Sequence, residues 1–207
     1  MVDELDAGYR RFRETVWPTE RSRFRALATA GQKPHSLVIA CSDSRVDPAL
    51  LFQSRPGELF VVRNVANLVP PCEHGGLYHG TSAAIEFAVT GLGVRNILVM
   101  GHSGCGGIAA CLAGEPKPEE SFIGLWMRNL AAARKEVTRD ACPERALEHL
   151  GVRQSLANLM SFPFVAERVE ADDLRLLGAW FEIESGRLLW LDDETSVFRD
   201  AEDFRPA

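Results

Sequence analysis

The chain has 207 residues, of which 46% are hydrophobic and 25% charged, and its formal net charge is −6. This composition is ordinary for a folded protein with a real core, so it excludes extensive disorder, and the length favours a single domain over residues 1–207. The acidic balance, with no basic run, disfavours nucleic acid as a partner.

Residues 1–33 predict a helical arm. Apolar residues recur at helical spacing in two stripes, first Leu5, Tyr9, Phe12 and Val16, then Phe24 and Leu27. The Trp17-Pro18 pair between the stripes is expected to interrupt the helix, because proline lacks the backbone donor that a helix interior needs. Such an arm is not stable in isolation, so we expect it to pack against something else.

Residues 34–113 predict a βαβ core. Three short, continuous apolar runs are typical of strands buried on both faces of a parallel sheet. They lie at 36–41, 59–63 and 96–100. Between the second and third runs, residues 81–92 keep helical spacing. Strand, helix and strand in this order predict functional loops at the carboxyl ends of the strands.

Residues 114–207 predict further helices and edge strands. Helical periodicity indicates amphipathic helices over 122–137 and 147–159, the second with Pro143 in its first turn. Runs at 175–183 and 188–191 indicate a hairpin at the sheet edge, and the acidic tail from Asp192 is expected to fray. The predicted fold class is α/β, a mainly parallel central sheet flanked by helices, with an antiparallel edge strand and the N-terminal arm.

Five cysteines, at 41, 72, 105, 111 and 142, form an odd set without the spacing of a small disulfide-linked domain. The first residues are acidic, and no apolar stretch of export or membrane-spanning length follows them. We therefore expect a cytoplasmic protein with reduced thiols and no membrane partner.

Two motifs each lie at the carboxyl end of a predicted strand. Ala-Cys-Ser-Asp-Ser-Arg occupies 40–45, and Gly-His-Ser-Gly-Cys-Gly-Gly occupies 101–107. They bring Cys41, His102 and Cys105 to strand ends, where two thiols and one imidazole form a three-ligand set that zinc uses while it keeps a fourth position free. A structural zinc site would need a fourth Cys or His, and none lies at zinc-finger spacing from either motif.

Other interpretations of these segments stay open. The glycines at 101, 104, 106 and 107 lie where a phosphate-binding loop would lie, but they do not follow the dinucleotide pattern and no Gly-Lys-Ser/Thr is present. Cys72 and His74 have the spacing of a second metal pair, without an evident third ligand, which favours an ordinary loop. His74 and His79 are candidates for moving a proton to solvent, or bystanders.

The two motifs, together with Pro-Gly-Glu-Leu-Phe-Val-Val-Arg-Asn-Val-Ala-Asn at 56–67, resemble the β-class carbonic anhydrases. The resemblance covers residues 20–113 closely and the rest in outline. It implies a zinc enzyme that interconverts carbon dioxide and bicarbonate, with one zinc per chain on Cys41, His102 and Cys105. It also implies a homodimer or a dimer of dimers, with active sites at the subunit interface.

The resemblance further implies a catalytic pair, Asp43 and Arg45. The expected reaction is attack on carbon dioxide by zinc-bound hydroxide, which Asp43 orients while Arg45 keeps the carboxylate ionised and away from the metal. Two rivals keep the same metal site: a hydrolase of carbon disulfide or carbonyl sulfide, and a noncatalytic zinc-binding protein. The intact pair argues against the second, because a structural site has no evident need of an orienting carboxylate.

The substrate pocket implied by the resemblance is apolar, and its matching residues are Phe60, Val65 and Phe87. Carbon dioxide carries no charge, so such a pocket needs only one or two donors, for which the candidates are the Gln32 amide and backbone N–H groups near Gly106. Gln32 stands nine residues before the first ligand, as in a plant-like branch of the family where this side chain reaches the partner subunit's substrate. Val38 stands where a bicarbonate-regulated branch has tryptophan, and Phe87 replaces a frequent tyrosine.

Overall fold

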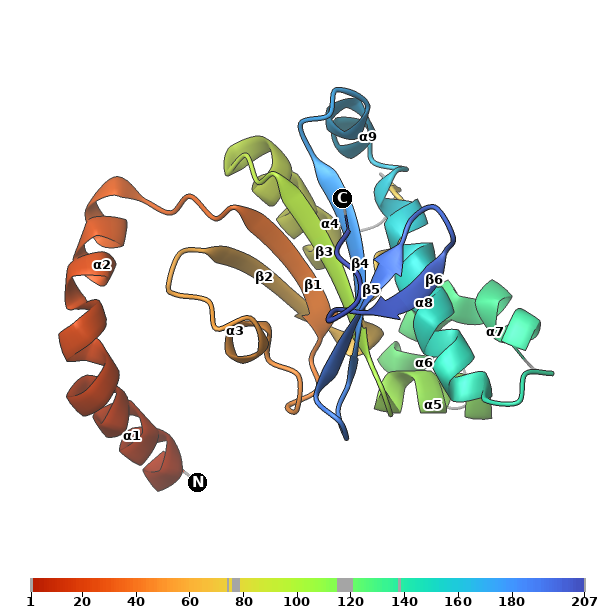
Figure 1. Ribbon diagram of the computed structural model, residues 1–207, viewed down its shortest axis with the longest axis horizontal. Helices are drawn as coiled ribbons and strands as arrows, with labels where there is room; N and C mark the ends of the chain where they lie inside the picture. The colour runs from red at the N-terminus through yellow and green to blue at the C-terminus, as the bar shows by residue number, and fades with distance from the viewer. Residues whose placement is uncertain (1, 74, 76–78, 115–120, 138, 207) are drawn as a thin grey trace.

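The computed structural model describes residues 2–73, 75, 79–114, 121–137 and 139–206, and its centre is one six-stranded sheet (Figure 1). The strand order is β2-β1-β3-β4-β5-β6. The strands are β1 (Ser36–Cys41), β2 (Leu59–Asn64), β3 (Asn96–His102), β4 (Arg175–Glu182), β5 (Arg187–Asp192) and β6 (Val197–Asp200). The first four in sheet order pair in parallel, and the last two join antiparallel. The predicted α/β class, with its antiparallel edge, is confirmed.

Helices form in the predicted arm, in the connection from β2 to β3 and in the connection from β3 to β4. In chain order they are α1 (Val2–Arg11), η1 (Phe12–Val16), α2 (Trp17–Ala30), α3 (Pro48–Leu51), η2 (Val65–Asn67), α4 (Gly80–Glu86), η3 (Phe87–Gly91), α5 (Gly106–Ala113), α6 (Phe122–Met127), η4 (Arg128–Leu130), α7 (Ala131–Val137), α8 (Pro143–Leu159) and α9 (Pro163–Glu170). Pro143 lies in the first turn of α8, as predicted. Among the described residues, none of these helices has the length and apolarity to span a bilayer.

The strands β1 and β3 are buried on both faces. Leu37 and Ile39 join a core cluster with residues of α4, η3, α8 and α9, whereas Val38 and Ala40 join another cluster with residues of β5 and the segment around α3. Successive side chains of a strand point to opposite faces, so continuous apolar runs require cover on both sides. This explains why the runs predicted these strands well.

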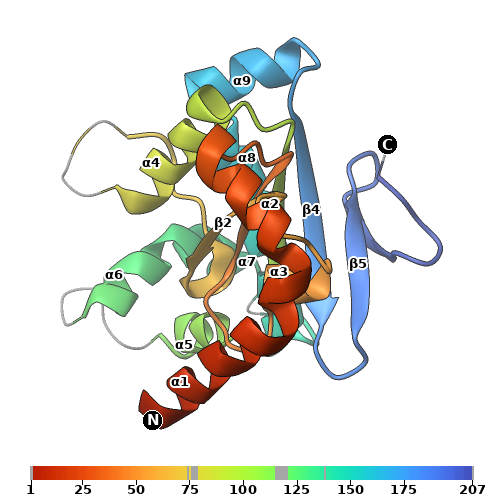
Figure 2. The same ribbon diagram turned by 90° about the vertical axis from the view of Figure 1, so that its left-hand side faces the viewer.

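The N-terminal arm stands away from the sheet, and α1, η1 and α2 contain no buried residue (Figures 1 and 2). The expected interruption at Trp17-Pro18 is wrong in part, because the chain stays helical from residue 2 to residue 30. A π-helical turn, η1, ends with the Trp17 N–H bonded to the carbonyl of Phe12, and this wider turn carries the helix past Pro18. Within α2, Arg23 pairs at 2.9 Å with Glu58, which lies just before β2.

The expected fraying from Asp192 is also wrong. Residues 197–200 form β6, which pairs antiparallel with β5. Arg199 contacts the Asp192 carboxylate at 2.8 Å, and the ring of Phe198 packs on His149 with centroids 4.2 Å apart. These contacts stabilise the chain after Asp192 as a strand, although its acidic local sequence led us to expect fraying. The short helices α3 and α9 were not predicted, although both begin at a proline.

Candidate metal centre

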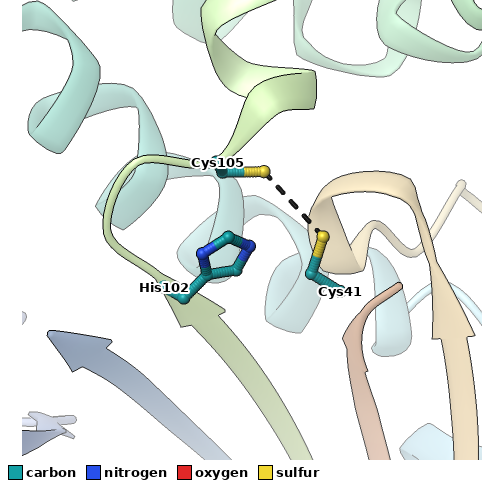
Figure 3. A group of neighbouring side chains, drawn as sticks. All are labelled: Cys41, His102 and Cys105. Atoms are coloured by element: carbon teal, nitrogen blue, oxygen red, sulfur yellow. Dashed lines mark hydrogen bonds between the residues drawn. The ribbon is translucent and has the colours of Figure 1, made fainter. Parts of the chain in front are cut away.

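Three potential metal ligands converge at the carboxyl ends of two adjacent strands (Figure 3). Cys41 ends β1 and His102 ends β3, and these strands pair in parallel. Cys105 follows three residues later, immediately before α5. All three residues are buried, and their ligand atoms lie within 4.8 Å of one another. The strand-end rule of parallel sheets therefore brought together residues that are 64 positions apart in the chain.

The spacing of the donor atoms fits a zinc ion. The sulfur atoms of Cys41 and Cys105 are 3.9 Å apart. Two sulfurs that bind one tetrahedral zinc at about 2.3 Å lie about 3.8 Å from each other. The chemistry of the set, two thiols and one imidazole, is also a combination found in catalytic zinc sites.

The imidazole of His102 presents an unused nitrogen to this group. Its Nδ1 lies 3.0 Å from the Ser103 carbonyl, which only accepts, so Nδ1 carries the hydrogen and donates it. Nε2 then has a free lone pair, and within the described part of the chain this buried atom has no hydrogen-bond partner. A buried acceptor without a partner is costly, and a bound cation removes that cost.

The two thiols differ in acidity because they share one small site. A hydrogen bond from Cys105 lowers the pKa of Cys41, and His102 adds to this effect against the opposing effect of burial. The contact with Cys41 raises the pKa of Cys105, and burial acts in the same direction. Two neighbouring thiolates repel each other, so a divalent cation is what allows both to be ionised together.

Asp43 and Arg45 form a bidentate pair beside the ligands. The Arg45 hydrogen bonds hold the pKa of Asp43 well below its usual range. Arg45 also donates from Nη2 to the Gly104 carbonyl at 3.0 Å. Asp43 Oδ2 lies 3.9 Å from Nε2 of His102, which places the carboxylate at the edge of the three-ligand group.

Arg63 and Asp47 support the loop after β1, and sequence reasoning missed this role. The Arg63 guanidinium donates to the carbonyl of Cys41 at 3.0 Å and to that of Asp43 at 2.6 Å. It also contacts the Asp47 carboxylate at 3.0 Å. Asp47 in turn caps the N-terminus of α3. No local pattern signals these contacts, because Arg63 lies on a different strand from the loop that it holds.

Glu148 was missed as well. It is buried on α8 and accepts hydrogen bonds from the Cys105 backbone and from Trp180. The sequence does carry one signal for it. Glu148 occupies a helical stripe with Val152, Ser155 and Leu159, all of them buried. A carboxylate on such a stripe requires partners from elsewhere in the fold.

Of the expected pocket residues, only two lie beside the ligands in the same chain. Gly106 follows Cys105 directly, and Val65 packs against Gly107 and lines a cavity of about 510 Å³. Phe60 pairs with Leu37 near the amino end of β1, whereas Cys41 pairs with Asn64. Four residues of strand separate the two positions by about 13 Å.

Phe87 and Gln32 also lie away from the ligands of their own chain. Phe87 packs on Phe60, with ring centroids 5.9 Å apart, and its side chain is half exposed. Gln32 is exposed and precedes the amino end of β1. One chain therefore does not assemble all five expected pocket residues.

The glycines at the end of β3 and in the turn after it serve packing and turn geometry rather than a phosphate-binding loop. A Cβ atom on Gly101 would lie 2.8 Å from Val152, and one on Gly107 would lie 2.6 Å from Val65. Gly104 adopts a positive φ of 63°, which a turn between strand and helix requires. These roles account for Gly101, Gly104 and Gly107 without a nucleotide.

The second candidate pair is not tested as a metal site, because His74 lies outside the described residues. The backbone N–H of Cys72 donates to the Ser161 hydroxyl at 2.8 Å. His79 Nε2 lies 2.7 Å from the Gly75 carbonyl. Cys72 and His79 thus have ordinary loop contacts.

Comparisons with known proteins agree with the site. A family model described as carbonic anhydrase matches residues 36–188. A carbonic anhydrase of Pseudomonas aeruginosa is 42% identical over 203 residues, which cover 96% of this chain and 90% of that protein. Beta carbonic anhydrase 3 of Arabidopsis thaliana is 36% identical over 207 residues, covering 94% of this chain and 79% of that protein.

Solved structures show the same fold. The β-carbonic anhydrase CcaA matches with a TM-score of 0.89 and 33% identity, covering 96% of this chain and 98% of that one. A structure described among two tetrameric β-carbonic anhydrases of Sordaria macrospora matches with a TM-score of 0.71 and 30% identity, covering 92% of this chain and 93% of that one.

Proposed function

This chain belongs to the β-class carbonic anhydrases, so it is a zinc-dependent lyase that hydrates carbon dioxide reversibly, and on that premise we propose how its residues divide the work. Cys41, His102 and Cys105 hold the ion through two sulfur atoms and Nε2. Zinc bound there supplies the Lewis acidity that makes a water molecule a good nucleophile near neutral pH.

Asp43 orients that water. Its carboxylate lies 3.9 Å from Nε2 of His102 and is ionised, so it accepts a hydrogen bond and turns a lone pair of the water oxygen toward carbon dioxide. This juxtaposition of an arginine-held carboxylate with three ligand atoms is the observation that carries the proposal. Hydration of carbon dioxide by the water that Asp43 holds would give bicarbonate and release one proton to solvent.

Arg45 positions Asp43. The Arg45 guanidinium donates to both carboxylate oxygens of Asp43, from Nε to Oδ1 at 2.9 Å and from Nη2 to Oδ2 at 2.7 Å. A carboxylate engaged in this way stays ionised and is kept from joining the metal ligands. Its further bond to Gly104 ties the pair to the loop that carries Cys105.

The substrate pocket is completed across a dimer interface. Val65 and Gly106 serve the site of their own chain, whereas Gln32, Phe60 and Phe87 serve the site of a partner subunit. Three observations support this arrangement: these side chains lie away from their own ligands, the arm has no buried residue, and it exposes Leu5, Tyr9 and Val16. A relative from Sordaria macrospora is described as tetrameric, which is consistent with a dimer of dimers.

The protein works in a reducing compartment, the cytoplasm. All five cysteines are free thiols, and two of them are the proposed zinc ligands. Fractionation of the source cells with an antibody against the chain tests this location, and recovery in an oxidising compartment would contradict it.

Stopped-flow hydration of carbon dioxide with a pH indicator tests the function. We expect fast turnover by the purified protein, its loss after chelation and its return when zinc is added back. Protein that holds one zinc per chain but gives no hydration would contradict the proposal. Assays with carbonyl sulfide and carbon disulfide would then separate a hydrolase of sulfur analogues from a noncatalytic zinc protein.

A further inference from the structure

A buried carboxylate lies behind the metal centre. Glu148 is on α8, which packs against β3 and β4, and only 5% of its surface is exposed. Glutamate is rarely buried to this extent unless its oxygens have partners. The reaction as proposed above does not use this residue.

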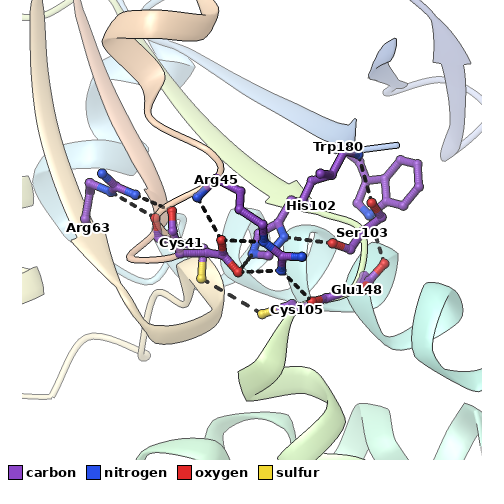
Figure 4. Close-up of polar contacts among 11 residues, drawn as sticks. Cys41, Arg45, Arg63, His102, Ser103, Cys105, Glu148 and Trp180 are labelled. Carbon is purple, nitrogen blue, oxygen red and sulfur yellow. Dashed lines mark hydrogen bonds and ion pairs between the residues drawn. The ribbon is translucent and has the colours of Figure 1, made fainter. Parts of the chain in front are cut away.

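Both oxygens of Glu148 are engaged (Figure 4). One accepts the backbone N–H of Cys105 at 3.2 Å, and the other accepts Nε1–H of Trp180 at 3.1 Å. Backbone N–H and indole N–H groups only donate, so the side chain at this position must accept on both sides. Glutamate meets this demand and glutamine does not, because one end of an amide is a donor.

The backbone of Cys105 needs an anchor of this kind. Gly104 and Gly106 flank it, and among the described residues no atom lies within 4 Å of where a Cβ at either glycine would be. A residue between two unpacked glycines has more conformational freedom than one between bulky neighbours. The Gly104 carbonyl accepts a hydrogen bond from Arg45, and Glu148 accepts one from the backbone N–H of Cys105 itself.

We propose that Glu148 is a positioning residue of the metal centre, which fixes the backbone of Cys105 and thereby the direction of its thiol toward the other ligands. The inference rests on the proposed ligand set, because it concerns only how one of those ligands is held. Glu148 does not contact the substrate in this proposal. A role confined to joining α8 to β4 through Trp180 is the competing explanation.

Zinc affinity distinguishes the two roles. We would titrate zinc into wild type and Glu148→Gln in competition with a chromophoric chelator, and measure urea unfolding of both proteins without metal. We expect Glu148→Gln to bind zinc about 10- to 100-fold more weakly, the usual effect of removing a partner of a metal ligand. Cobalt-loaded protein should also show altered thiolate-to-metal absorption bands, which report on the geometry at Cys105.

Glu144→Gln is the matched control, because it makes the same chemical change at an exposed position in the first turn of the same helix. It should bind zinc as wild type does. If Glu148→Gln binds zinc within about 2-fold of wild type while its metal-free form loses stability, the residue only joins helix to sheet and the inference is wrong. An equal loss of affinity in Glu144→Gln would overturn it too.

If Glu148→Gln does not fold, Glu148→Asp decides. It keeps the charge but withdraws the oxygens by one methylene, which breaks the bond to Cys105. Weaker zinc binding in folded Glu148→Asp supports the inference, and unchanged binding overturns it. These results are distinguishable from failure of the proposed function. If the proposed ligand set were wrong, the wild-type protein would not bind zinc, or the Cys105→Ser variant would still bind it.

Discussion

Arg45 holds Asp43 through two parallel hydrogen bonds, Nε to Oδ1 at 2.9 Å and Nη2 to Oδ2 at 2.7 Å, and its backbone N–H adds a third at 2.9 Å. The pair is close in sequence, but the carboxylate it fixes lies beside ligands from two different strands. The orientation of Asp43 therefore depends on a planar fork that lysine does not possess.

Asp43→Ala should keep zinc but lose turnover. Removing the carboxylate takes away the acceptor that orients water, and such groups contribute about 100-fold or more to rate. The measurement is kcat/KM for hydration alongside zinc content by mass spectrometry. Arg45→Lys, which retains charge without the fork, should fall between wild type and Asp43→Ala. Normal turnover in Asp43→Ala would remove this residue from the mechanism.

Cys105→Ser should lose zinc. Serine replaces a thiolate with a hydroxyl that stays protonated at neutral pH, so only two good ligands remain. Cys111→Ser is the control, since this buried cysteine is not a proposed ligand: it lies on the next helix, α5, and its Sγ is 3.9 Å from the Met127 carbonyl. Zinc per chain after dialysis, with circular dichroism to verify folding, gives the answer. Full zinc content in Cys105→Ser would refute the ligand assignment.

Gln32→Ala and Cys41→Ser should complement each other. Each variant alone lacks a part of every site. In a mixed dimer, the Gln32→Ala chain has intact zinc ligands and the Cys41→Ser chain provides Gln32, so one of the two sites is complete. After subunit exchange in an equal mixture, roughly one quarter of wild-type turnover per chain should return, since half of the dimers are mixed and each has one complete site. An active monomer in light scattering, or no recovery on mixing, would contradict the shared site.

Gly107→Ala should destabilise the protein, whereas Gly106→Ala should not. A Cβ on Gly107 would lie 2.6 Å from Val65 Cγ1 and 3.3 Å from Ala66 Cβ, but none of the described atoms lies within 4 Å of a Cβ on Gly106. Overpacking of this kind costs about 1–3 kcal/mol. Urea denaturation of the two variants measures the difference. Equal stability would mean that the start of α5 shifts without cost.

His149 should make stability fall with acidity. Burial lowers the pKa of its imidazole from 6.5 to about 4, and Arg153 and Arg145 act in the same direction. Between these values the unfolded chain binds a proton that the folded protein does not, so the free energy of unfolding decreases as pH falls through that window.

The size of this effect can be measured by urea unfolding at two pH values. From pH 7 to pH 5 the loss due to His149 should be about 2 kcal/mol. In His149→Phe, which keeps an aromatic ring between Trp180 and Phe198, the pH dependence should be smaller by that amount. If the free energy of unfolding depends on pH as strongly in His149→Phe as in wild type, folding does not shift the pKa of His149.

The central strands and the three ligands were predictable from the sequence, because a strand buried on both faces leaves a continuous apolar run and parallel strands end at a common edge. Cys41 and His102 each stand directly at the end of such a run. Their convergence follows from topology alone once the βαβ order is recognised.

Other features depend on partners that are distant in the chain. Strand β6 has four residues of alternating exposure, and its stability comes from Asp192, His149 and the edge of β5. The role proposed for Glu148 depends on Cys105, 43 residues away. The π-helical turn before Pro18 is a local rearrangement that the proline rule does not foresee. The position of Gln32 has meaning only with a second chain.

The attachment of Cys41 and His102 to β1 and β3 has a thermodynamic consequence. Strand pairing and core packing already fix the backbone of both ligands, so zinc does not have to organise them, in contrast to small domains that fold only around their metal. Zinc binding therefore does not have to offset the loss of conformational entropy that would come from ordering the ligand backbone, and the affinity for zinc is higher as a result. The metal-free chain should remain folded and exchange zinc reversibly, with added stability governed by the free zinc concentration relative to its Kd.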